Sequence, residues 1–191
     1  MIKLLGISGS LRQGSFNTAL LRAAQRLAIP GVTLDLATLH GIPLYDGDVE
    51  AREGLPAAVE ALKARVVAAD GLLLATPEYN NGIPGVFKNG IDWLSRPADD
   101  IPRVFGDRPV AVMGASPGGF GTILSQNAWL PVLRTMRARQ WMGGRLMVSR
   151  ATSVMGADGE IADEKTLAQL DAFVRGFAAF VAAQSDRSAS A

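Results

Sequence analysis

Short apolar runs alternate with longer segments of helical periodicity along this chain. Five runs bounded by turn residues predict β-strands over residues 2–8, 32–37, 71–76, 109–115 and, more weakly, 145–149. Apolar residues spaced three and four apart predict helices over residues 17–27, 55–69 and about 163–183, and another helix through Phe87, Ile91 and Trp93. Strands that alternate with helices indicate βαβ units and a mostly parallel sheet.

The predicted strands are continuous apolar runs, which indicates that helices cover both faces of the sheet. The fold class is therefore α/β. Five strands fit a flavodoxin-like three-layer sandwich with a five-stranded parallel sheet better than a six-stranded dinucleotide-binding fold. No linker-like segment divides the chain, so we expect one domain over residues 1–184 and a frayed tail at 185–191. Pro131 is expected to interrupt the helix after the fourth strand.

Composition narrows the chemistry that this chain can perform. The formal net charge is +1, and no basic stretch is interleaved with aromatics, which gives no sign of nucleic-acid binding. There is no cysteine and only one histidine, His40, so thiolate ligands, iron–sulfur clusters and cysteine nucleophiles are excluded and a histidine metal site is disfavoured. No signal peptide is evident and no stretch approaches the length of a membrane-spanning helix, so we expect a cytoplasmic protein.

The loop after the first strand has the chemistry of an anion site. It leads into a helix through Gly9-Ser10-Leu11-Arg12-Gln13-Gly14-Ser15-Phe16-Asn17. Such a turn directs free backbone amides and the positive end of the helix dipole at one point, which suits a phosphate dianion. Ser10, Ser15 and Asn17 add side-chain donors, and Arg12 can add a charge-assisted contact.

Two nucleotide-binding motifs nearly fit this loop and fail. Gly9 and Gly14 have the spacing of a P-loop, but that motif continues with Lys and then Ser or Thr. This chain has Ser15 and Phe16 at those two positions. The glycines also miss the spacing of a nicotinamide-binding turn. A serine-capped helix start that binds no ligand is the alternative to a phosphate site.

The loop after the third strand combines stiffness with polar groups. Its sequence is Thr76-Pro77-Glu78-Tyr79-Asn80-Asn81-Gly82-Ile83-Pro84-Gly85. The prolines stiffen the segment, and the glycines let its backbone approach a flat ligand closely. A loop of this kind at the carboxyl end of a strand favours a binding role. The alternative is a solvated turn in which Pro84 only starts the next helix.

The loop after the fourth strand contains the G-x-S-x-G pattern of α/β-hydrolases, within Gly114-Ala115-Ser116-Pro117-Gly118-Gly119-Phe120-Gly121. Two features oppose a serine hydrolase. Pro117 follows the serine and has no N–H for an oxyanion hole. His40 precedes the serine, whereas that fold places its histidine last. The segment is therefore either a glycine-rich edge whose amides line a ring or a flexible connection.

Together these motifs resemble the NADPH-dependent FMN reductase family, which includes quinone, chromate and azo-dye reductases. The resemblance rests on the first loop, on residues 76–80 with Pro84-Gly85, and on Lys88-Asn89-Gly90-Ile91-Asp92-Trp93-Leu94-Ser95. It covers the chain from the first strand to about Gly121. It implies a flavodoxin-like fold, non-covalently bound FMN, NADPH or NADH as electron donor, and a homodimer or homotetramer.

The resemblance also implies which residues bind the cofactor. Those expected at the FMN phosphate are Ser10, Arg12, Ser15, Phe16 and Asn17. Those expected along the isoalloxazine are Pro77, Glu78, Tyr79 and Asn80, with Ser116 and Gly118 on its other side. Asn81 is included among the cofactor-binding residues, although it departs from members that have an aromatic residue there. Trp93 and Trp129 belong either to the core or to an interface, and because the family forms oligomers, we expect at least one of them at a subunit interface.

The chemistry implied by the family is a ping-pong cycle. Hydride passes from the nicotinamide to flavin N5 and then to a small acceptor such as a quinone, chromate, an azo compound or free flavin. Because the flavin carries the reaction, the protein needs no catalytic acid, base or nucleophile. The alternatives are a non-enzymatic electron carrier, which is usually strongly acidic, and a flavin-binding module. Steady NADPH oxidation would separate the enzyme from both.

Overall fold

The computed structural model describes the backbone of residues 1–189 and the side chains of residues 1–184. Its centre is a parallel sheet in the order β2-β1-β3-β4-β5, with β6 also paired to β4. The strands are β1 (Ile2–Ser8), β2 (Val32–Ala37), β3 (Gly71–Ala75), β4 (Pro109–Ala115), β5 (Arg139–Gln140) and β6 (Met147–Val148). This order is flavodoxin-like, so the predicted fold class is confirmed.

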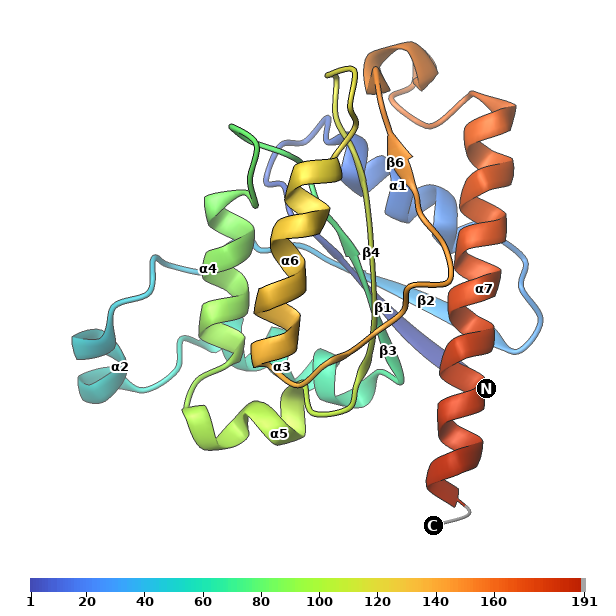
Figure 1. The fold of residues 1–191 in the computed structure, drawn as a ribbon. Coiled ribbons are helices and arrows are strands. Elements are labelled where there is room, and N and C mark those ends of the chain that lie inside the picture. The colour runs from blue at the N-terminus through green and yellow to red at the C-terminus, as the bar shows by residue number, and fades with distance from the viewer. Residues whose placement is uncertain (190–191) are drawn as a thin grey trace.

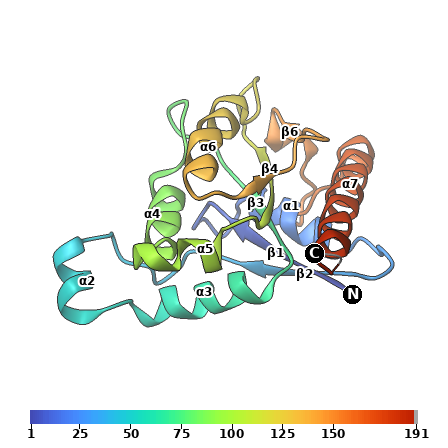
Figure 2. The same cartoon turned by 60° about the horizontal axis from the view of Figure 1, so that its bottom comes forward.

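Helices cover both faces of the sheet (Figures 1 and 2). The helices are α1 (Phe16–Gln25), α2 (Gly47–Glu53), α3 (Ala57–Ala68), α4 (Gly85–Leu94), α5 (Ile101–Val104), α6 (Ile123–Thr135) and α7 (Glu164–Ala189). Short 3-10 helices span Ala98–Asp100 and Ala151–Val154. The predicted helices correspond to α1, α3, α4 and α7. The sequence pattern missed α2, because none of its residues is buried and it therefore has no apolar face.

Two separate cores explain why the strands are continuously apolar. Leu4 and Leu73 point to the face covered by α1 and α7. Their chain neighbours Leu5 and Leu72 point to the opposite face, where they pack with buried side chains of α3, α4 and α6. Successive side chains of a strand alternate between the two faces, so every position of a doubly covered strand is buried.

The far edge of the sheet differs from the predicted single strand at 145–149. The two-residue strands β5 and β6 pair with opposite ends of β4 instead. Between them the chain leaves the sheet, and Trp141 packs edge-on against Phe173 of α7 with ring centroids 5.0 Å apart. Within the described residues, Val112 in the middle of β4 consequently has no strand partner on this edge.

Pro131 lies inside α6 and does not interrupt it, so this prediction was wrong. A proline in a helix removes one N–H, which would have bonded to the carbonyl four residues earlier. That carbonyl belongs to Asn127, which is exposed and can be hydrated. The Pro131 carbonyl remains an acceptor and receives the Thr135 hydroxyl at 3.0 Å.

Trp93 and Trp129 both lie in the core of the single chain, with 0 % of either residue exposed. Trp129 packs edge-on against Phe87 with ring centroids 4.8 Å apart, and the Trp93 indole donates to the Pro43 carbonyl at 2.9 Å. The prediction that one of them lies at a subunit interface was therefore wrong. Because α4, α6 and the sheet bury both side chains, neither Trp93 nor Trp129 has exposed surface that a second subunit could contact.

The last helix, α7, contains a segment, Glu164–Gln184, that is long and apolar enough to span a membrane, contrary to the expectation from sequence. Leu170, Val174, Phe177 and Val181 are buried in the α1 side of the core. The apolar stripe of α7 is thus used for packing on the sheet. The helix continues to Ala189, so part of the expected tail is helical, and residues 190–191 lie outside the described residues.

Candidate functional site

The loops after β1, β3 and β4 meet at the carboxyl edge of the sheet, at the top of Figure 1. We name residues 9–15 the first loop, 76–84 the second loop and 116–122 the third loop. A small pocket that is open to solvent lies between them. Its lining residues are Ser10, Arg12, Ser15, Phe16, Asn17, Pro77, Glu78, Tyr79, Ala115, Ser116 and Pro117. Nine of the twelve predicted cofactor residues therefore meet in one pocket, and Asn80, Asn81 and Gly118 do not line it.

The first loop presents unused hydrogen-bond donors to this pocket. Ser15 caps α1, and its hydroxyl accepts from the Thr18 amide at 3.2 Å. The amides of Phe16 and Asn17, which directly precede Thr18 in the helix, donate to no acceptor within residues 1–189. Arg12 is exposed, has its guanidinium 5.9 Å from the Phe16 ring centroid and forms no ion pair with any described residue. Free amides at a helix N-terminus beside an unpaired cation are suited to an anion.

Asn17 joins the first loop to the end of β4. Its side-chain NH₂ donates to the Ala115 carbonyl at 2.9 Å, and its side-chain oxygen accepts from the Ala115 amide at 2.9 Å. Both residues are only 2 % exposed. These two bonds satisfy a main-chain donor and acceptor that would otherwise be buried without partners. The carboxamide thus holds α1 in place beside the pocket.

His40 supports the first loop from outside the pocket. Its Nε2 lies 3.1 Å from the Leu11 carbonyl, and its Nδ1 lies 3.0 Å from the Thr38 hydroxyl. The carbonyl can only accept, so Nε2 carries the proton in this contact. From the sequence, His40 was used only to argue against a histidine metal site and a serine hydrolase, and no structural role was predicted for it. No local pattern shows that the loop after β2 reaches Leu11.

The second loop contains a two-residue hairpin turn. Tyr79 and Gly82 exchange two main-chain hydrogen bonds of 3.2 and 3.0 Å. Asn80 and Asn81 form the tip with φ angles of 49° and 63°, a left-handed conformation that asparagine tolerates better than most residues. The tip is exposed, whereas Tyr79, which is 47 % exposed, lines the pocket. The hairpin therefore aims Tyr79 at the pocket and Asn80 and Asn81 at its rim.

Glu78 of the second loop binds the start of α6. Its Oε2 accepts from the Leu124 amide at 2.8 Å and from the Ser125 amide at 2.9 Å. Nearby, the buried Thr76 hydroxyl lies 2.8 Å from the Ser125 hydroxyl. The second loop is thus attached to α6, and through it to the third loop, by side chains as well as by the sheet.

The position of the third loop depends on the close approach of Gly114, at the end of β4, to Thr76 and Thr122. A Cβ at Gly114 would lie 2.1 Å from the Thr76 carbonyl oxygen and 2.4 Å from Thr122 Oγ1, so a larger residue would separate the second and third loops. Gly118 and Gly119 have open space instead, since a Cβ there would meet no atom closer than 3.6 Å. Ser116 accepts from the Gly118 amide at 3.3 Å. The loop is anchored at its base and open at its glycine-rich tip.

A larger groove of about 1160 Å³ runs along α6 and the broken edge of β4. It is lined by apolar residues such as Ile123, Leu130 and Trp141, and it contains none of the predicted cofactor residues. Nor does the described part of the chain bring three His, Cys, Asp or Glu side chains together as a metal site would require. The predicted cofactor residues therefore gather at the pocket between the three loops and not in this groove.

The family model for NADPH-dependent FMN reductase matches residues 2–153, which include all three loops. The chain belongs to this family. It is 45 % identical over 164 residues to an NAD(P)H-dependent FMN reductase of Pseudomonas aeruginosa, with 86 % of each chain covered. It is 35 % identical over 186 residues to a quinone reductase of Escherichia coli, with 94 % of this chain and 95 % of the relative covered.

Among solved structures, the flavoenzyme NAD(P)H:(acceptor) oxidoreductase of Paracoccus denitrificans aligns with a TM-score of 0.83 and 32 % identity, over 95 % of this chain and 97 % of that chain. This FMN reductase family member is therefore an oxidoreductase that uses FMN and takes electrons from NAD(P)H. The alternatives of an electron carrier or a flavin-binding module are not supported.

The residues at the three loops fit FMN. The unused amides and Arg12 match a phosphate, and Tyr79 and the open glycine tip of the third loop lie at the pocket and beside it. A helix N-terminus stabilises a nearby charge by only about 0.3 to 1 kcal/mol, whereas nanomolar binding needs about 12 kcal/mol. For FMN bound at this pocket with nanomolar affinity, the second and third loops would have to supply much of the binding free energy through contacts with the ring.

Proposed function

We propose that this FMN reductase passes hydride from NAD(P)H to small quinones, with FMN held between the three loops. The observation that carries the proposal is the meeting of the free amides of Phe16 and Asn17, the unpaired Arg12 and the half-exposed Tyr79 in one open pocket. Quinones are favoured as acceptors because relatives are named for them. One is a 2-hydroxy-1,4-benzoquinone reductase of a Burkholderia species, 35 % identical over 180 residues.

The proposed roles divide the site into a phosphate end and a ring end. Arg12, the hydroxyls of Ser10 and Ser15, and the amides of Phe16 and Asn17 hold the phosphate. The main chain of residues 77–79 lies along the isoalloxazine, and Ser116 and Gly118 border its other side. Asn80 and Asn81 bound the rim. FMN supplies the hydride chemistry, so the protein's part is to bind, orient and leave one side of the pocket open to the second substrate.

The proposal extends to assembly. Large apolar side chains are exposed along the third loop, α6 and the neighbouring groove, namely Phe120, Ile123, Leu124, Leu130 and Met142. An exposed apolar surface of this kind is typical of a protein interface. We propose a homodimer or homotetramer that uses it, built from one domain over residues 1–184 and acting in the cytoplasm. Light scattering of the wild type and of a Leu130→Glu variant tests the assembly, since the charge should dissociate it.

The reaction is tested with purified protein saturated with FMN and freed of excess flavin. We expect a yellow protein whose visible absorbance falls when NADPH is added without oxygen and returns when 1,4-benzoquinone follows. Free FMN at the same concentration is the control, because it shows how much reduction occurs without protein. A protein that stays colourless, binds no added FMN and does not oxidise NADPH with quinone would contradict the proposal.

A further inference from the structure

Glu78 caps a helix that lies 46 residues further along the chain. The first amides of any helix have no acceptor within it and need one from elsewhere. In α6 the N-cap residue Thr122 supplies no side-chain cap. Its hydroxyl instead accepts from Gln126 at 3.0 Å. The Glu78 carboxylate takes this place, with two bonds to the first turn and its negative charge at the positive end of the helix dipole.

This contact closes the ring end of the pocket. Glu78 lines the pocket together with its neighbours Pro77 and Tyr79, which form the wall from the second loop, and Ala115, Ser116 and Pro117 form the wall from the end of β4 and the third loop. The third loop continues from these residues into α6. Fixing the second loop to α6 therefore fixes the separation of the two walls between which a flat ring would lie. No bond joins Glu78 to the first loop within the described residues, so the phosphate end is independent of it.

We propose that Glu78 is a positioning residue, which holds the two walls of the ring site at their working separation instead of binding the flavin with its carboxylate. The role rests on the proposed function of the three-loop pocket. It has a specific consequence. Loss of the carboxylate weakens binding of the ring, and leaves the contribution of the phosphate unchanged.

Riboflavin separates the two ends, because it carries the isoalloxazine and lacks the phosphate. Dissociation constants of FMN and riboflavin are measured on the apoprotein of the wild type and of the variants Glu78→Ala and Glu78→Gln. Glu78→Ala should weaken both flavins by the same factor, roughly ten- to a hundredfold, the range for hydrogen bonds to a charged group. Glu78→Gln keeps an oxygen acceptor and loses the charge, so its factor should be smaller and again equal for both flavins.

Two readouts separate positioning from a loss of general stability. Hydrogen exchange of the Leu124 and Ser125 amides in the apoprotein should quicken in Glu78→Ala, while that of the Thr18 amide, which Ser15 caps, stays constant. The visible spectrum of bound FMN should also shift, because the ring changes surroundings. Glu60→Gln is the matched control: Glu60 is an exposed glutamate in the first turn of α3, and its carboxylate forms no hydrogen bond or ion pair with another described residue.

The role is overturned if both Glu78 variants bind the two flavins as the wild type does, or if they lose FMN affinity while riboflavin affinity stays constant. If Glu78→Ala does not fold, Glu78→Gln decides by the same two affinities. Failure of the proposed function looks different, since the wild type itself would then bind neither flavin.

Discussion

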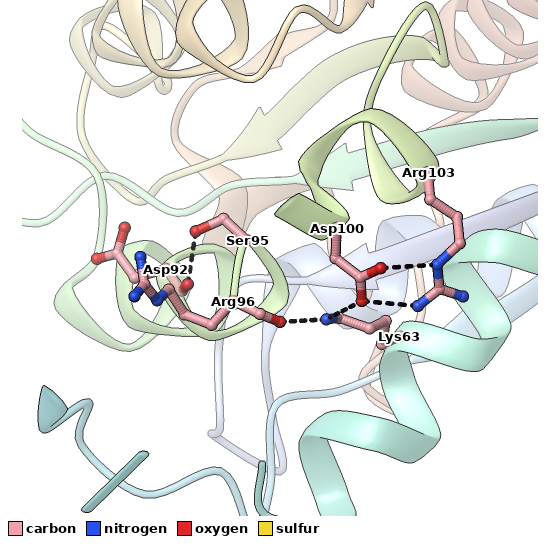
Figure 3. A network of polar contacts seen from close by, with 6 residues as sticks. All are labelled: Lys63, Asp92, Ser95, Arg96, Asp100 and Arg103. Atoms are coloured by element: carbon pink, nitrogen blue, oxygen red, sulfur yellow. Dashed lines mark hydrogen bonds and ion pairs between the residues drawn. The ribbon is translucent and has the colours of Figure 1, made fainter. Parts of the chain in front are cut away.

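The carboxyl edge of the sheet and the helical layer of α3, α4 and α5 use charged side chains in opposite ways. In the helical layer the Lys63 side chain is 5 % exposed; its ammonium donates to Asp100 at 2.9 Å and to the Arg96 carbonyl (Figure 3). Asp100 accepts two further bonds from Arg103, at 2.9 and 2.7 Å. At the sheet edge, Arg12 has no carboxylate partner among the described residues. Charges that stabilise the fold are matched within it, and the cation proposed for the ligand is left unmatched.

The electrostatics of the helical layer follow from this matching. Hydrogen bonds from Arg103 and then from Lys63 hold the pKa of Asp100 well below its usual range, against the opposing effect of partial burial. Asn17 and Glu78 share one property with each of the two regions. They lie at the pocket, yet both side-chain polar atoms of Asn17, and Oε2 of Glu78, are bound to the protein's own main chain. A polar residue at the pocket is thus a candidate ligand contact only where its hydrogen-bonding groups are still free.

The largest effect is expected from Asn17→Ala, which should lower the free energy of unfolding by about 3 kcal/mol. The change leaves the Ala115 amide and carbonyl buried without partners, at about 1 to 3 kcal/mol each. Urea unfolding of the apoprotein measures it. Glu60→Ala, at an exposed site on α3, should change stability by less than about 0.5 kcal/mol. Equal stability of the two variants would refute the main-chain role of Asn17.

Lys63→Ala should lower the free energy of unfolding by about 2 kcal/mol and leave FMN affinity unchanged. The Arg96 carbonyl loses its donor, but Asp100 keeps Arg103 and is partly exposed, so the cost stays below the 3 to 5 kcal/mol of a fully buried broken pair. Urea unfolding and flavin titration are measured together. Arg103→Ala, which removes an exposed partner, should cost less than about 1 kcal/mol. A loss of FMN affinity in Lys63→Ala would contradict the claim that charges in the helical layer act on stability alone.

Arg12→Ala should weaken FMN binding roughly tenfold, or about 1.4 kcal/mol, and leave the free energy of unfolding unchanged. Arg12 pairs with no carboxylate among the described residues, so the fold loses nothing with it. Fluorescence titration at two salt concentrations measures the effect, because salt screens an exposed charge and should narrow the difference. Riboflavin is the control ligand. If its affinity falls as much as that of FMN, Arg12 does not act at the phosphate.

Acid should weaken the helical layer through Asp100. The folded pKa of Asp100 lies below the unfolded value of about 3.9, so its contribution is complete above that value and is lost as pH falls below about 4. Between pH 5 and pH 2, the free energy of unfolding should fall by roughly 1 kcal/mol less in Asp100→Asn than in the wild type. The difference is this small because Asp100 is partly exposed, which weakens its ion pairs. Unfolding curves at pH 5, 4, 3 and 2 test this. Parallel losses in the two proteins would contradict it.

The smallest effect is expected at the hairpin tip. Asn81→Tyr places an aromatic residue at a φ of 63° and should cost somewhat less than 1 kcal/mol, since a left-handed conformation is strained for residues other than Gly and Asn. Asn81→Gly should be neutral or slightly stabilising in the folded hairpin. Thermal unfolding of the two variants, compared with the wild type, measures the difference. A tyrosine variant as stable as the glycine variant would show that the turn is not strained.

The fold was largely predictable because each core strand is a continuous apolar run and each amphipathic helix has a regular stripe. The place of the site followed as well, since neighbouring parallel strands end at one edge. The partners of its side chains did not follow. Asn17 binds a residue 98 positions away and Glu78 a helix 46 positions away, and both depend on strand order and register. Pro131 and Trp129 were mispredicted for a related reason, because their surroundings are made by distant segments.

The hairpin from Tyr79 to Gly82 is closed by its own two main-chain hydrogen bonds. A surface turn that is closed by its own main-chain hydrogen bonds tolerates substitutions, or an insertion of one or two residues, without a change in the packing of the core. The hairpin tip is therefore a region of the fold in which the sequence can change at little cost to the core. Directed evolution for new quinones or dyes should begin with libraries at Asn80 and Asn81, with the anchored residues beneath left as they are.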